Sequence, residues 1–199
     1  MSNKTNPSKK HLELKGHLLI AMPSMEDTRF ARAIVLVCSH SEEGSMGFIL
    51  NQPVSTPLFT DILEELDIEE EILDPESKNR EVPIFRGGPV EQGRGFVVHS
   101  LDFSSSASAR VGDLAGVTAT LEALRCLAGP TPPENAIMLL GYAGWSEGQL
   151  EDEIIQNGWL TMPASRALVF ETHHTMQYDA ALAAMGISEA TLSTNVGHA

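Results

Sequence analysis

The chain has 199 residues, of which 42% are hydrophobic and 20% charged, and this size and composition predict one globular domain. Thirteen Lys and Arg against 27 Asp and Glu give a net charge of −14, which disfavours direct nucleic-acid binding because phosphates are repelled. No apolar run is long enough to span a bilayer, and residues 18–22 are too short for a signal-peptide core, so we expect a cytoplasmic protein without membrane contact.

The first part of the chain predicts a tail followed by strands. Residues 1–11 are polar and lysine-rich, and we expect them to form a disordered tail before a single domain at 12–199. Apolar runs at 18–22 and 33–38 predict buried strands, and 46–50 predicts a third strand. A polar turn joins the last two strands into a hairpin.

A helix is predicted where Thr56 precedes Pro57, because a cap residue followed by proline is a common helix start. Apolar residues at four-residue spacing then give this helix one core-facing side. The acidic segment at 69–79 has the composition of a solvated loop, which we prefer to a binding role.

The second half of the chain alternates between strands, glycine turns and helices. We expect a plain turn at Gly87-Gly88, although such a turn can also present amides to an anion. The predicted elements are strands at 83–86, 95–99, 137–140 and 168–170, and helices at 117–127 and 176–185. This mixture predicts an α+β or mixed α/β fold.

The central stretch, 139–153, runs from an apolar strand through glycines into a helix. Ser146 and Gln149 have the spacing of a capping box, which favours Ser146 as the N-cap of that helix. The same serine lies in Gly144-Trp145-Ser146-Glu147-Gly148, which matches the Gly-x-Ser-x-Gly pattern of a hydrolase nucleophile elbow. A small serine hydrolase that uses Ser146 is therefore the alternative, although an elbow places its serine directly at the strand end.

The cysteines and histidines do not form a metal-binding motif. Cys38 and Cys126 lie in apolar sequence, so we expect reduced thiols in the core. No Cys-x-x-Cys accompanies Cys38 and His40, and His173 and His174, if they lie on a strand, would face opposite sides of it. We therefore predict no metal.

Other chemistry has little support in the sequence. No phosphate-binding loop and no dinucleotide fingerprint is present, so we expect no cofactor. Asp27, His40, Glu91 and His99 lie near the predicted strand ends and could form an acid–base site only if the fold brings them together.

Four segments together form a distinctive pattern, and they are Gly16-His17-Leu18-Leu19-Ile20-Ala21-Met22-Pro23-x-Met25-x-Asp27-x-x-Phe30, His40-x-x-x-Gly44-x-Met46-Gly47-x-x-x-Asn51-x-Pro53, Gly87-Gly88-Pro89-Val90 with Arg94-Gly95-Phe96-x-x-His99, and Gly141-Tyr142-Ala143-Gly144-Trp145-x-x-Gly148-Gln149-Leu150-Glu151. In order and spacing these segments resemble the AlgH/YqgE family over nearly the whole chain. Tyr178 departs from the tryptophan that members often carry nearby, which affects only local packing.

The resemblance implies a single α+β domain with a small, strongly bent mixed sheet or partial β-barrel surrounded by helices. It implies no known reaction, and members have been called transcriptional regulators. We expect a binding or regulatory protein and not an enzyme, without strong direct DNA contact and with an unknown protein or small molecule as partner. The candidate binding residues are Asn51, Gly87, Gly88, Arg94, His99, Gly141, Gly144 and Trp145.

Overall fold

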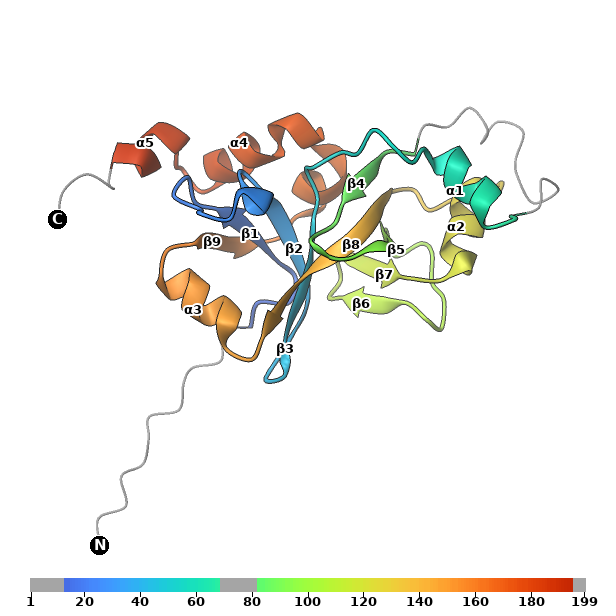
Figure 1. Ribbon diagram of the computed structural model, residues 1–199, viewed down its shortest axis with the longest axis horizontal. Helices are drawn as coiled ribbons and strands as arrows, with labels where there is room; N and C mark the ends of the chain where they lie inside the picture. The colour runs from blue at the N-terminus through green and yellow to red at the C-terminus, as the bar shows by residue number, and fades with distance from the viewer. Residues whose placement is uncertain (1–12, 69–81, 195–199) are drawn as a thin grey trace, which may run out of the picture.

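The computed structural model describes residues 13–68 and 82–194, so the predicted tail at 1–11 and the acidic loop at 69–79 lie outside the described residues. Nine strands form one sheet in the order β6-β7-β5-β8-β3-β2-β1-β9, with β4 paired to β8 beside this path (Figure 1). The strands are β1 His17–Ala21, β2 Ile34–Ser41, β3 Gly44–Ile49, β4 Ile84–Arg86, β5 Val90–His99, β6 Ala109–Val111, β7 Ala115–Thr118, β8 Ala136–Ser146 and β9 Trp159–Pro163.

Helices surround this sheet, which confirms the predicted fold class of mixed helices and strands. They are α1 Phe59–Glu65, α2 Leu121–Ala128, α3 Gln149–Ile155, α4 His174–Ala184 and α5 Glu189–Thr194, with a 3₁₀ turn η1 Thr28–Phe30 and a π turn η4 Ala167–Glu171. In Figure 1, α1 and α2 lie together at one end of the molecule, and α3, α4 and α5 lie around β1 and β9. Within the described residues, no helix is long and apolar enough to cross a membrane.

Strand β8 joins the two halves of the sheet. Its first part pairs with β5 in antiparallel and with β4 in parallel direction, and its second part pairs with β3. Gly141 lies where the partners change and has a φ of +70°, a conformation that glycine adopts without strain. The prediction that the strand ends before these glycines is wrong, because Gly141 lets β8 bend and continue to Ser146.

Three of the predicted binding residues are required for this junction. A Cβ at Gly88 would lie 2.0 Å from the carbonyl carbon of Tyr142, and a Cβ at Gly87 would lie 2.3 Å from the carbonyl oxygen of Gly141. A Cβ at Gly141 would lie 2.7 Å from the carbonyl oxygen of Val90. These glycines therefore let two backbones approach closely, which accounts for them without a ligand.

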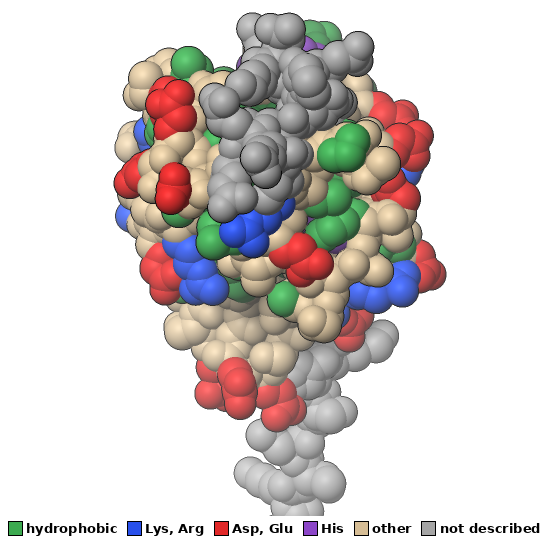
Figure 2. Space-filling model, turned by 90° about the vertical axis from the view of Figure 1, so that its right-hand side faces the viewer, with side chains coloured by type: hydrophobic (Ala, Val, Ile, Leu, Met, Phe, Trp, Pro, Cys, Tyr) green, Lys and Arg blue, Asp and Glu red, His purple; other side chains and the backbone are tan. Residues whose placement is uncertain are grey.

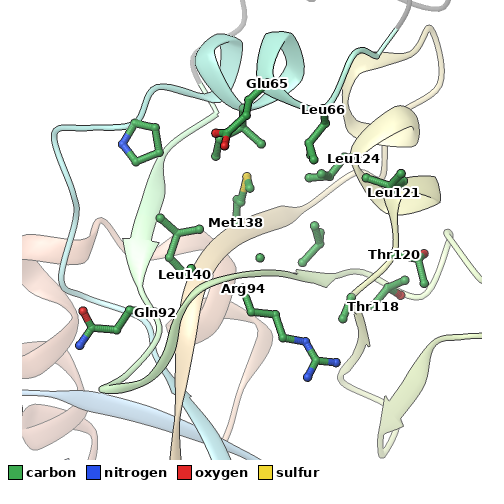
Figure 3. A pocket seen from close by; sticks show the side chains of 16 residues that line it. Glu65, Leu66, Gln92, Arg94, Thr118, Thr120, Leu121, Leu124, Met138 and Leu140 are labelled. Carbon is green, nitrogen blue, oxygen red and sulfur yellow. The ribbon is translucent and has the colours of Figure 1, made fainter.

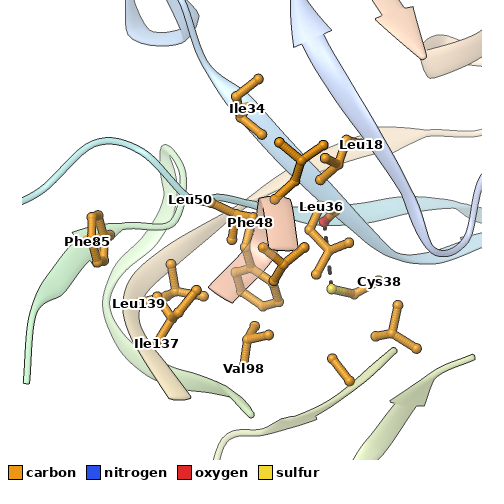
Figure 4. Packing of buried hydrophobic residues seen from close by; sticks show 14 of the residues in the cluster. Leu18, Ile34, Leu36, Cys38, Phe48, Leu50, Phe85, Val98, Ile137 and Leu139 are labelled. Carbon is orange, nitrogen blue, oxygen red and sulfur yellow. Dashed lines mark hydrogen bonds between the residues drawn. The ribbon is translucent and has the colours of Figure 1, made fainter. Parts of the chain in front are cut away.

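The core lies on both faces of the sheet, because alternate residues of a strand point to opposite sides. Leu36 and Phe48 belong to the larger cluster, whereas Val35 and Val37 pack on the other face near α3. In Figure 4, Leu36, Phe48, Val98 and Leu139 point towards a common centre. Helix α4 covers this cluster through the buried Tyr178, whose hydroxyl donates to the carbonyl oxygen of Ala21 at 2.8 Å.

The predicted hairpin is confirmed, since β2 and β3 pair in antiparallel direction with Val35 opposite Ile49. The helix predicted at 117–127 is wrong in its first part, where Val117 and Thr118 belong to β7 and pair with β5. Such β-branched residues fit a sheet well, and the helix begins only at Leu121.

One further element prediction is wrong, and one predicted helix is present but begins later than expected. The apolar run at 168–170 forms the π turn η4 instead of a strand, since a short buried run does not reveal its own conformation. Helix α1 begins at Phe59, after the predicted Thr56-Pro57 start, because the carboxylate of Asp61 accepts the backbone N–H of Leu58 at 2.8 Å.

The close backbone contact at Gly88 leads to a prediction about the stability of the protein. Replacing Gly88→Ala should lower the free energy of unfolding by about 3 kcal/mol, because the new methyl group overlaps backbone atoms that cannot move separately. Gly93→Ala is the control, since a Cβ there has no atom within 4 Å, and we expect a change within about 0.5 kcal/mol. Urea unfolding measures both values, and equal midpoints for the two variants would contradict the proposed overlap.

Candidate functional site

Ser146 is the last residue of β8, and α3 begins at Gln149 with Gly148 as its N-cap. The side-chain oxygen of Gln149 accepts both the backbone N–H and the hydroxyl of Ser146, each at 3.1 Å. One half of the predicted capping box is therefore present, but the Ser146 hydroxyl donates and does not accept a helix N–H. The N-cap prediction is wrong, because Gly148, with a φ of +71°, turns the chain and moves the helix start past Ser146.

Helix α3 holds the two tryptophans through one carboxylate. Trp145 of β8 and Trp159 of β9 donate their indole N–H groups to Oε2 of Glu153 at 2.9 and 2.8 Å. Gln149 donates its amide N–H to Oε1 of the same side chain at 3.0 Å. Both indole rings are buried, so Glu153 satisfies donors that would otherwise lack a partner.

A cavity of about 300 Å³, which we call the tryptophan cavity, lies beside this arrangement. Asp27 and Arg29 form an ion pair on its wall, with Nη2 of Arg29 2.6 Å from Oδ2 of Asp27. The hydrogen bond from Arg29 holds the pKa of the Asp27 carboxyl below its usual value. Two predicted binding residues line this cavity, and the lining includes Phe30, Pro89, Gly144, Trp145, Glu153 and Trp159.

A larger groove of about 550 Å³ lies between α1, α2 and the sheet, and we call it the α1–α2 groove (Figure 3). Leu66 and Leu121 are 41% and 44% exposed and line this groove. Figure 2 faces this end of the molecule and shows hydrophobic side chains among acidic and basic ones. The apolar residues that line the groove are Pro57, Ile62, Leu66, Val97, Ala119, Leu121, Leu124, Met138 and Leu140.

Arg94 is the predicted binding residue at this groove. Its guanidinium donates to Oε2 of Glu91 at 3.0 Å and lies 5.0 Å from the centre of the Phe96 ring. In Figure 3 the side chain points away from α1 and α2. Arg94 therefore borders the groove, with its charge turned towards the surface beside Phe96.

Asn51 and His99 have structural contacts in this fold. The Asn51 side chain accepts the backbone N–H of Ile34 at 3.0 Å and donates to the carbonyl oxygen of Arg32 at 2.8 Å. His99 is fully buried, with Nδ1 2.9 Å from the carbonyl oxygen of Ser100 and Nε2 2.9 Å from the hydroxyl of Thr118. A carbonyl oxygen can only accept, so Nδ1 carries a hydrogen, and in the neutral ring Nε2 is then the acceptor for the Thr118 hydroxyl.

The four candidate acid–base residues do not meet in one place. Asp27 lies at the tryptophan cavity, Glu91 pairs with Arg94, and His99 is buried beneath β7. His40 lies under α3, where its Nδ1 is 2.8 Å from the Ser45 hydroxyl and its Nε2 is 3.6 Å from Glu151. An acid–base centre built from these residues is therefore not assembled by the fold.

The predicted histidine pair has a different geometry from the one expected. His173 precedes α4 as its N-cap and His174 is the first residue of the helix, so the two residues do not lie on a strand. Their ring centres are 4.2 Å apart. Within the described part of the chain, no group of three His, Cys, Asp or Glu side chains could hold a metal ion.

Sequence patterns did not reveal the α1–α2 groove, Trp159 or Glu153. The groove depends on two helices that are far apart in the sequence, and no local pattern brings them together. Trp159 and Glu153 could have been noticed, because the chain has only two tryptophans and a carboxylate stands near both of them in the sequence. A buried tryptophan usually needs an acceptor for its N–H.

A family model described as AlgH-like (DUF179) matches residues 18–190. The UPF0301 protein of Rhizobium meliloti is 52% identical over 192 residues, covering 94% of this chain and 93% of that protein. That of Rhizobium etli is 49% identical over 187 residues, covering 92% of each. The chain therefore belongs to the AlgH-like family.

Solved structures agree with this assignment. The solution structure of the AlgH protein from Pseudomonas aeruginosa matches with a TM-score of 0.75 at 35% identity, covering 100% of both chains. The crystal structure of DIP2367 from Corynebacterium diphtheriae matches with a TM-score of 0.64 at 21% identity over 86% of each chain, which shows a shared fold.

From the hydrogen bonds of Ser146 we expect a structural role, and this role can be distinguished experimentally from that of a catalytic nucleophile. Ser146→Ala removes an exposed hydroxyl bonded to Gln149, so we expect the free energy of unfolding to change by at most about 0.5 kcal/mol. We also expect no fluorophosphonate adduct on Ser146 in the native protein, as detected by peptide mass spectrometry. Covalent labelling of this serine, with loss of an esterase activity in the alanine variant, would contradict the prediction.

The two thiols should differ in reactivity. Burial raises the pKa of Cys38 well above its ordinary value, and burial together with the Asp102 and Glu122 carboxylates raises the pKa of the half-buried Cys126. A raised pKa leaves less thiolate at neutral pH. With iodoacetamide at pH 7.5, we expect slow modification of Cys126 and modification of Cys38 only after unfolding. Rapid labelling of Cys38 in the native protein would show that it is accessible.

Proposed function

We propose that the protein acts by binding and without covalent chemistry, and that the α1–α2 groove holds a small, largely apolar molecule. The observation that supports this most is the lack of side chains along part of the groove wall. Gly93 and Gly95 of β5 line the groove, and neither has a left-handed φ. A Cβ at Gly95 would meet only the terminal methyl group of Met138, at an ordinary 3.6 Å. These two glycines are therefore required neither by conformation nor by packing.

The size and lining of the groove fit such a ligand. A volume of about 550 Å³ is within the range of small-molecule sites, and such sites are mostly apolar with a few polar groups. A bound apolar molecule would cover the exposed Leu66 and Leu121. The Thr120 hydroxyl forms no capping bond to α2, and together with the Gln92 amide it can offer hydrogen bonds at the edge.

Under this proposal the protein acts in the cytoplasm, as the sequence predicts. Any regulatory role that it has would depend on binding of the ligand in the groove. Direct DNA contact is not part of it, since the net charge of −14 opposes an approach to phosphates. A hydrolase at Ser146 has less support, because its hydroxyl donates to the side-chain oxygen of Gln149, although Ser146 does end strand β8 as a nucleophile elbow would require.

The proposal can be tested with a substitution that fills the groove with a side chain and leaves the fold intact. Gly95→Leu should place an apolar side chain in the space of the ligand, whereas Thr60→Leu, on an exposed position of α1, adds the same side chain elsewhere. Using the neutral fluorescent probe N-phenyl-1-naphthylamine, we expect saturable binding to the wild type and to Thr60→Leu, and at least five-fold weaker binding to Gly95→Leu.

Thermal unfolding of the same variants provides the control for folding, and we expect all three proteins to melt within a few degrees of one another. Native mass spectrometry of the gently purified wild type should also detect a retained small molecule that Gly95→Leu lacks. Equal probe binding by a well-folded Gly95→Leu variant would contradict the proposal.

A further inference from the structure

The tryptophan cavity shares no lining residue with the α1–α2 groove, and its chemistry is different. Three aromatic rings lie together at its wall. The ring centres of Trp145 and Trp159 are 6.2 Å apart with an interplanar angle of 79°, and those of Phe30 and Trp159 are 5.5 Å apart at the same angle. Aromatic faces carry partial negative charge and attract cations, most strongly in tryptophan.

The carboxylate of Glu153 adds a full negative charge to these rings. It is half-buried, and its three hydrogen bonds come from the two indole N–H groups and the amide of Gln149. All three donors are neutral, and among the residues that the structure describes no cationic side chain pairs with Glu153. Its charge is therefore held in place by hydrogen bonds but is not neutralised.

The other charged groups on the cavity wall do not neutralise it. Asp27 and Arg29 also line the cavity, but the Arg29 guanidinium makes three hydrogen bonds to the Asp27 carboxylate, at 2.9, 3.1 and 2.6 Å. This pair has no net charge. The cavity as a whole thus keeps one unit of negative charge, from Glu153, beside a set of aromatic rings.

We propose that the tryptophan cavity binds one organic cation, an alkylammonium or guanidinium group. A volume of about 300 Å³ is at the lower end of the range for ligand sites, which suits a single cationic head with a short carbon chain. Gly144 lines the cavity with its backbone, and a Cβ there would meet the Tyr142 ring at 3.3 Å. The cation belongs either to a free small molecule or to the arginine or lysine side chain of a partner protein.

The protein carries its own reporter for this site. Its only two tryptophans are Trp145 and Trp159, so intrinsic fluorescence reads the cavity directly. We expect choline to change the emission in a saturable manner and the uncharged isostere 3,3-dimethyl-1-butanol to bind at least ten-fold more weakly. Added sodium chloride should weaken choline binding, since salt screens the charge of Glu153. Equal responses to choline and its isostere, or a response that does not saturate, would overturn the proposal.

Variants of α3 test the role of the carboxylate. Glu153→Gln should weaken choline binding at least ten-fold, whereas Asp152→Asn, which removes a charge from the exposed neighbouring position, should change it less than two-fold. Unchanged binding by a folded Glu153→Gln variant would overturn the proposal. If that variant unfolds, the comparison of choline with its isostere on the wild-type protein still decides the question.

A second probe distinguishes the two sources of the cation. N-acetyl-argininamide represents the side chain of a partner protein, and choline represents a free small molecule. Tighter binding of the arginine derivative would assign the cavity to a partner's side chain, and tighter binding of choline would assign it to a metabolite. Either order supports a cation site, and absence of saturable binding by both probes contradicts it.

Discussion

Where the chain leaves β4, its backbone lies directly against the two peptides of β8 that join Gly141, Tyr142 and Ala143. Gly87 donates its N–H to the carbonyl oxygen of Leu140 at 2.7 Å, and its own carbonyl oxygen accepts the N–H of Ile49 at 2.8 Å. One residue therefore connects β8 with the end of β3. Because both segments have glycines at the contact, their backbones can approach closely. Strand β8 can therefore pair with β4 in its first part and with β3 in its second part, and it remains in one sheet.

Helix α3 shows how charged side chains can organise a buried region. Its sequence is strongly acidic, which usually indicates a solvated surface. Two of these carboxylates instead turn inward, since Glu153 orients two indole rings and Glu151 lies 3.6 Å from the imidazole of His40. The packing of α3 on the sheet thus combines apolar burial through Leu150 with directional contacts to β2, β8 and β9.

Much of the fold could be predicted from the sequence, because apolar runs and their length report burial directly. The hairpin of β2 and β3 and the mixture of helices and strands were accessible in this way. The course of β8 was not, since Gly141 signals a change of direction without saying that the strand continues beyond it. The π turn at η4 was also hidden, because a run of three apolar residues fits several conformations.

The candidate sites were harder to predict than the fold. Trp145 was identified from its place in the glycine-rich stretch, but its partners Glu153 and Trp159 belong to α3 and β9 and meet it only in three dimensions. The glycines of the β4–β8 junction and those of the groove look alike in sequence. Only the atoms around each position separate Gly88, which a methyl group would strain, from Gly95, where it would fit.

The order of the strands also determines how the sheet ends. In the described structure the strand order ends at β6 and at β9, and an exposed strand edge is a place where another chain can add and begin an aggregate. Strand β6 has only three residues, and β9 ends at Pro163, which has no backbone N–H to offer. A short edge on one side and a proline on the other leave little backbone for an unwanted neighbour, which helps to keep the sheet from growing beyond a single molecule.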